Sequence, residues 1–187
     1  MKHLEGLTAQ FDAIAQDAAN LVTGLDDQCG SWRATAESWS VAQCLEHLAA
    51  SNRAYLHPMQ DAARESRAQR GLRLWPSIPG LLGHWFASSM EPPAKALSKA
   101  KAPTAIRPRG DLTVQEAFQD FLASHHQVET FLSESSSLDL NRVSFRNPFI
   151  RGLSFSVASG LHIIAAHDRR HLWQAWQIRR SAESAFS

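Results

Sequence analysis

Three histidines carry the clearest chemical signal in this sequence of 187 residues. His167 and His171 stand four residues apart, which places both imidazoles on one face of a helix, close enough to bind one metal ion. His47 lies in an earlier amphipathic segment. If the two segments are neighbours, three neutral imidazoles would hold a divalent ion and leave coordination positions open for water or substrate. Such an ion lowers the pKa of its water toward about 7, or binds an incoming thiolate.

The pair formed by His167 and His171 also has a plainer interpretation. Two histidines four residues apart often arise by chance, and taken alone they fit core or rim residues that donate hydrogen bonds to carbonyl groups. The addition of His47 favours a metal site. A histidine cluster with a purely structural role remains the alternative.

Further polar residues could support such a site: Gln43, Gln174, His125 and Asp168. Gln43 lies one turn before His47, and Gln174 shares the face of His167 and His171. Either amide could bind the metal's water or a substrate, or could be a hydrogen-bonded rim residue. His125 sits within an apolar stripe and is a candidate polar group in the cavity, although a lone histidine there is more often a hydrogen-bonded core residue.

Two carboxylates adjoin the histidines. Asp168 occupies the position of the glutamate in the zinc-protease motif HExxH, but aspartate is one methylene shorter and no separate third ligand follows downstream. We therefore expect Asp168 to be solvated or to support a ligand histidine from behind. Glu46 could orient an imidazole or act as a base, and we expect it to be a surface charge.

The segments that carry these residues follow a helical period, and no convincing alternating strand pattern is found. Long helices are predicted over residues 3–26, 41–69, 113–133 and 154–180. Capping boxes at Ser40–Gln43 and Thr113–Glu116 mark two of the helix starts. Four amphipathic helices without strands predict an all-α protein, a four-helix bundle, with one domain across residues 1–187.

A Pro-rich insert at residues 71–111 separates the second and third long helices. A short helix is predicted within it, near Leu81–Ser89. The insert could roof a pocket or could be a packed surface connection. The last helix has a second apolar side, which includes Leu161 and Leu172, and this side requires cover from the insert or from a second subunit. On that basis we expect a homodimer.

The composition narrows the class of protein. Apolar residues make up 44% and charged residues 20%, which fits a globular chain, and the net charge of +1 argues against nucleic acid or an anionic membrane as partner. Two cysteines without a CxxC pair favour a reducing compartment, and the N-terminus lacks the apolar block of a signal peptide. We expect a cytoplasmic protein that acts on a small molecule.

Two segments together resemble the DinB-like superfamily of metalloenzymes. They are WSVAQCLEHL at residues 39–48 and HDRRHLWQ at residues 167–174. The resemblance implies a four-helix bundle with a three-histidine site, and it assigns His47, His167 and His171 as ligands of nickel, zinc or iron. Relatives include transferases and isomerases that use low-molecular-weight thiols, and proteins assigned as hydrolases.

The sequence thus predicts a metal-dependent enzyme in which the ion activates water or a low-molecular-weight thiol for attack on a small electrophile. The alternative is a non-catalytic module of the same fold, related to stress, that binds a metal or a ligand. No acid or base beyond the histidines distinguishes the two.

Overall fold

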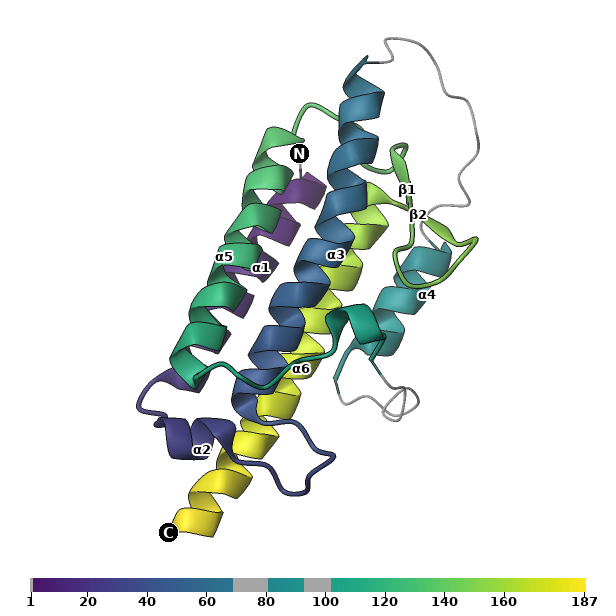
Figure 1. Cartoon of the computed structure of the whole chain (residues 1–187). Helices are drawn as coiled ribbons and strands as arrows, with labels where there is room; N and C mark the ends of the chain where they lie inside the picture. Colours follow the sequence, from purple (N-terminus) through teal and green to yellow (C-terminus); the bar gives the residue numbers. More distant parts are fainter. Residues whose placement is uncertain (1, 69–80, 93–101) are drawn as a thin grey trace.

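The computed structural model describes residues 2–68, 81–92 and 102–187 (Figure 1). Within them the chain forms six α-helices, one 3₁₀ helix and two short strands. In chain order these are α1 (Lys2–Val22), α2 (Asp27–Ser31), α3 (Val41–Ala68), α4 (Leu81–Met90), η1 (Thr104–Ile106), α5 (Val114–Glu134), β1 (Ser144–Arg146), β2 (Ser154–Ser156) and α6 (Val157–Phe186).

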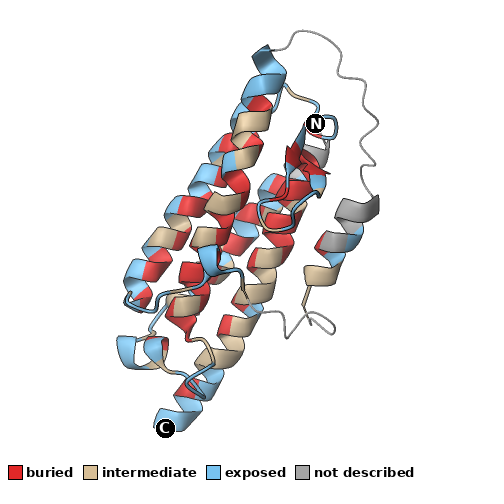
Figure 2. Ribbon diagram, turned by 45° about the vertical axis from the view of Figure 1, so that its right-hand side comes forward, coloured by how far each residue is buried: buried red, intermediate tan, exposed pale blue. Residues whose placement is uncertain are grey.

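The long helices α1, α3, α5 and α6 form a four-helix bundle, which confirms the predicted all-α class. Helix α3 packs against α5 and α6, and α1 packs against the same two helices from the opposite side. Figure 2 shows buried residues along the inner faces of these helices. The core includes Phe11, Leu48, Phe121 and Ile164, each at most 1% exposed. Burying such side chains contributes roughly 1.5–3 kcal/mol each, so the core fixes which helix faces meet.

Both predicted capping boxes are present. The Ser40 backbone N–H donates to Gln43 Oε1 at 3.1 Å, and the Gln43 N–H donates to Ser40 Oγ at 3.2 Å. Thr113 and Glu116 make the corresponding pair at the start of α5. Since these hydrogen bonds join residues only three apart, local sequence is enough to place the two helix starts.

The last bundle helix begins later than predicted, and the expectation that no strands form is wrong. Ser154–Ser156 pairs antiparallel with Ser144–Arg146, and α6 then starts at Val157 with Ser156 as N-cap. Phe145 and Phe155 face each other in this ribbon and are both buried. Strands of three residues are too short to show an alternating pattern. The first helix is also shorter than predicted, and Gly24, at φ +70°, follows its end at Val22.

Helix α4 lies along α6, within the predicted insert (Figure 1). An ion pair between Glu91 and Arg169 joins its C-terminal end to α6, with Arg169 Nε donating to Glu91 Oε2 at 3.0 Å. Residues 71–80 and 93–101 of the insert lie outside the described residues, so the predicted roof over a pocket is not tested there.

The second apolar side of α6 is covered within the same chain. Leu161 and Leu172 are fully buried, and α1 packs along α6, where Trp176 Nε1 donates to Asp17 at 2.9 Å. A second subunit is not needed to bury this side, so the predicted homodimer loses this argument and stays a prediction. Within the described residues, no helix is long and apolar enough to cross a membrane.

Candidate metal centre

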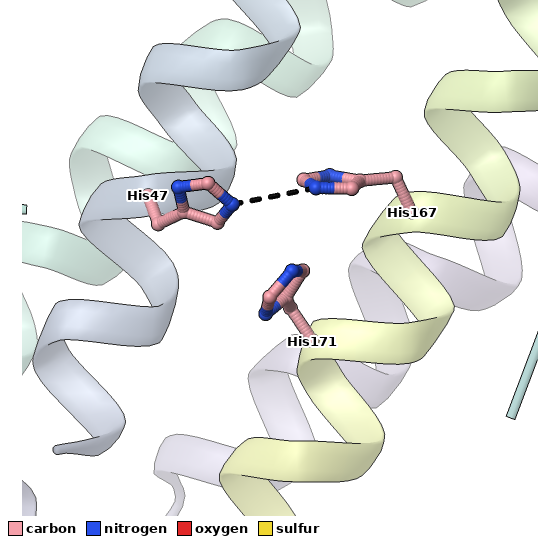
Figure 3. A group of neighbouring side chains, drawn as sticks. All are labelled: His47, His167 and His171. Carbon is pink, nitrogen blue, oxygen red and sulfur yellow. Dashed lines mark hydrogen bonds between the residues drawn. The ribbon is translucent and has the colours of Figure 1, made fainter. Parts of the chain in front are cut away.

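The three histidines singled out by their spacing meet between α3 and α6. Figure 3 shows His47 reaching from α3 toward His167 and His171 on α6. One ring nitrogen from each histidine lies within 4.8 Å of those of the other two. His47 Nε2 and His167 Nε2 are 3.3 Å apart. Two nitrogens bound at about 2.1 Å to one tetrahedral ion lie roughly 3.4 Å apart, so this spacing fits a shared metal.

His47 is held in one orientation by the backbone. Its Nδ1 lies 2.7 Å from the Ile106 carbonyl oxygen of η1. A carbonyl can only accept, so Nδ1 carries the proton and Nε2 of the neutral ring presents its lone pair to the cluster. Without a metal, His167 Nε2–H donates to that lone pair. For His167 to bind an ion through Nε2, its proton must move to Nδ1.

Burial keeps the cluster neutral. It is the main cause that lowers the pKa of all three imidazoles: His47 below its usual range, His167 well below, and His171 to about 3. The neighbouring histidines and Arg170 lower the pKa of His167 and His171 further. At neutral pH the rings therefore keep the lone pairs that a metal requires. His171 Nδ1 is buried and has no hydrogen-bond partner among the described residues.

The three histidines are covered to different degrees. Trp39 packs over it, with ring centroids 4.7 Å from His47 and 5.7 Å from His171. His47 is 2% exposed, whereas His167 and His171 are only partly buried. Gln174 also lies beside His171, where its amide raises the pKa against the larger effect of burial. The cluster is therefore less covered at the two α6 histidines than at His47.

Glu46 is not the surface charge that we expected. It is 8% exposed, and its two oxygens accept the backbone N–H groups of Arg109 at 2.9 Å and Gly110 at 3.0 Å. These two residues belong to the segment of residues 102–112, called the strap below, which crosses α3 (Figure 1) and contacts His47 through the Ile106 carbonyl. The expectation failed because the partners lie more than sixty positions away in the sequence.

Gln43 serves the helix start rather than the cluster. Its amide completes the capping box with Ser40, and its side chain packs under Gly110, where an added Cβ would lie 2.5 Å from Gln43 Nε2. Gly110 has φ +79°, a conformation that favours glycine. Because Gly110 has no side chain, the strap can approach Gln43 on α3 closely.

Asp168 and His125 form a second buried group with Asn52, called the interior polar cluster below. Asn52 Nδ2 donates to Asp168 Oδ2 at 3.3 Å, and His125 Nδ1 lies 3.8 Å from the same oxygen. His125 Nε2 donates to the Phe11 carbonyl at 3.0 Å. Asp168 is fully buried, so the expected solvated position is wrong, and its side chain faces the bundle interior. Asp168 lies on the same face of the helix as the apolar residues Leu161 and Leu172, and this spacing in the sequence indicates a buried position.

In the interior polar cluster the pKa of the histidine is raised, in contrast to the three histidines of the metal centre. Burial lowers the pKa of His125, but the nearby carboxylate of Asp168, 3.8 Å away, with the charge of Glu129, outweighs burial and raises the pKa overall. Burial also raises the pKa of Asp168. His125 donates from Nε2 to the Phe11 carbonyl and faces Asp168 with Nδ1, so its ring lies in the core and is not part of the three-histidine group.

The fold and the site define a helical-bundle protein with a three-histidine cluster that could hold a metal ion. Comparison with protein families extends this description. The model of the DinB superfamily matches residues 10–175, and the chain belongs to that superfamily. Searches of curated proteins and of solved structures found no match.

Proposed function

We propose that the protein binds one divalent transition metal ion, nickel, zinc or iron, through His47, His167 and His171. The observation that carries the proposal is the convergence of three neutral imidazoles whose ligand atoms lie within 4.8 Å of one another. Three protein ligands leave at least one position open, which is the arrangement of catalytic rather than structural sites.

We further propose that the open position takes a low-molecular-weight thiol or a water that attacks a small electrophile. A bound ion supplies positive charge that lowers the pKa of either group. The positions of the two carboxylates next to the histidines favour a thiol over water as the nucleophile. Glu46 is held by hydrogen bonds from the strap, and Asp168 faces the bundle interior, so neither is placed to act as a base for water. A thiol starts from a pKa of about 8.5 and can become a thiolate on the metal without a separate base, whereas water benefits from one.

The chain's own groups prepare the site in three ways. The Ile106 carbonyl fixes the His47 tautomer, so that its lone pair faces the cluster. Burial keeps His167 and His171 unprotonated. Trp39 shields the face nearest His47, and the partly exposed side along α6 is left for the ligand.

The first test is elemental analysis of the protein expressed without a His-tag. We expect about one equivalent of transition metal in the parent protein and none in the His167→Ala/His171→Ala variant. A matched control is His57→Ala/His126→Ala, which removes two exposed histidines and should keep the metal. A parent protein that stays metal-free after incubation with nickel, zinc and iron would overturn the proposal.

The second test separates catalysis from plain binding. In the Co²⁺-substituted protein, 2-mercaptoethanol should produce a thiolate-to-cobalt absorption band in the near ultraviolet. If no added thiol reaches the metal, the thiol mechanism is wrong. A thiol that binds the metal but is never transferred to an electrophile would favour the non-catalytic binding module.

A further inference from the structure

We propose that Glu46 is a positioning residue for the metal centre, which acts on His47 through the strap. The expected effect on metal binding rests on the proposed function, whereas the expected effect on the His47 tautomer does not. The residue touches none of the three imidazoles in the contacts described above. Its two oxygens instead hold the backbone of Arg109 and Gly110.

The carboxylate is well suited to this task and a neutral amide is not. Both oxygens of Glu46 accept a backbone N–H, at 2.9 and 3.0 Å, in a position that is 8% exposed. Hydrogen bonds to a charged acceptor are roughly twice as strong as those between neutral groups. A glutamine could accept only one of the two N–H groups, because its amide nitrogen would face the second.

The strap carries this restraint to the imidazole. Ile106 lies three residues before Arg109, its side chain is 4% exposed, and its backbone is closed into η1 by a hydrogen bond from Ile106 N–H to the Pro103 carbonyl at 3.1 Å. The Ile106 carbonyl then accepts from His47 Nδ1. Glu46 and His47 are consecutive in α3, so one turn of the helix holds the strap at two points.

The Arg109 side chain contributes little to this restraint. Its guanidinium is 3.6 Å from Glu46 Oε1, and the side chain is 76% exposed. Exposed ion pairs of this kind contribute about 0–1 kcal/mol. The Arg109→Ala variant removes the ion pair and keeps the backbone N–H, so it is a matched control for the Glu46→Gln variant.

The test compares the two variants by the tautomer of His47 in the metal-free protein, read from ¹⁵N chemical shifts, and by competition for Zn²⁺. We expect the parent and Arg109→Ala to show Nδ1–H alone. Glu46→Gln should show both tautomers and bind Zn²⁺ about 10- to 100-fold more weakly, as for loss of a group that supports a metal ligand. A purely structural residue would lower the melting temperature and leave the tautomer and the affinity unchanged, and that result would overturn the proposal.

A second measurement uses the unaltered protein, in case Glu46→Gln does not fold. Coupling between two sites is reciprocal, so Zn²⁺ should slow hydrogen exchange at the Arg109 and Gly110 amides. Unchanged exchange in a protein that binds Zn²⁺ through the cluster would overturn the role of Glu46. Failure of the parent to bind Zn²⁺ would instead contradict the proposed function, and the His47 tautomer would still decide the positioning role.

Discussion

Two buried groups of polar residues use histidine in opposite ways. In the three-histidine cluster, burial lowers the pKa of every imidazole, His171 to about 3. In the interior polar cluster, Asp168 and Glu129 outweigh burial and the pKa of His125 rises. In the first group, burial and the neighbouring charged groups favour the neutral imidazole, whereas in the second group a facing carboxylate favours the protonated imidazole.

The two groups meet at consecutive residues of α6. His167 belongs to one and Asp168 to the other, because consecutive helical residues point about 100° apart. His167 turns toward His47 on α3, and Asp168 turns toward His125 on α5. A metal can therefore be bound by one group, while the other joins helices in the core. The predictions below test this division, beginning with the largest expected effect.

Removal of a histidine should weaken metal binding strongly in the first group only. For His171→Ala we expect Zn²⁺ affinity to fall by roughly 100-fold or more, since structural zinc sites bind with about 10–16 kcal/mol shared among their ligands. For His125→Ala we expect unchanged affinity, measured by competition with a chelating dye. Comparable losses in the two variants would contradict the division.

Removal of the buried carboxylate should affect stability in the second group only. Asp168→Ala leaves Asn52 Nδ2 without its acceptor and removes the carboxylate that lies 3.8 Å from His125 Nδ1, and we expect the free energy of unfolding to fall by about 3 kcal/mol. Urea denaturation measures this loss. Asp61→Ala, which removes an exposed carboxylate, is the control and should change stability by less than about 1 kcal/mol. Zn²⁺ affinity should stay within about twofold, and a larger change would link the two groups.

The pH dependence of stability should carry opposite signs in the two groups. The folded-state pKa of His171, about 3, lies below its unfolded value, so the unfolded chain binds more protons between pH 3 and 6.5. The metal-free protein should therefore lose stability as pH falls through this window, by at most about 1.4 kcal/mol per pH unit for this one histidine. The His125 contribution, whose folded pKa is raised, is fully present below the unfolded pKa and is lost as pH rises through the folded pKa.

Denaturation of the metal-free protein from pH 3 to 8 measures these slopes. His171→Ala should make the acid slope shallower, and His125→Ala should leave that slope in place. An acid slope that His171→Ala does not change would mean that the lowered pKa of this imidazole does not govern the acid lability.

The smallest expected effect comes from a substitution that gives the three-histidine cluster a neighbouring carboxylate, as the interior polar cluster has. In Gln174→Glu, a carboxylate replaces the amide beside His171, as Asp168 stands beside His125. We expect the pKa of His171 in the metal-free protein to rise by about one unit, read from an NMR titration. Gln174→Ala is the control and should lower it slightly. An unchanged pKa in Gln174→Glu would show that a neighbouring carboxylate is not what separates the groups.

Local sequence was sufficient where the interacting residues are close along the chain. The capping boxes at Ser40 and Thr113 join residues three apart, and both helix starts were predicted correctly. Glu46 was misjudged for the opposite reason, because the backbone groups that bury it lie in the strap. Asn52 is buried on α3, and nothing in the sequence of that helix indicates that its partner is Asp168 on α6.

The sequence by itself determined the helical class, and it indicated that His167 and His171 share one face, since helical period and spacing depend on neighbouring residues alone. Only the tertiary structure decided that His47 lies beside this pair and that the Ile106 carbonyl fixes the tautomer of His47. Only the packing of α3, α5 and α6 turned Asp168 away from the three histidines and toward His125. These contacts join residues from separate helices and from the strap, and no local pattern encodes which of those segments will be neighbours.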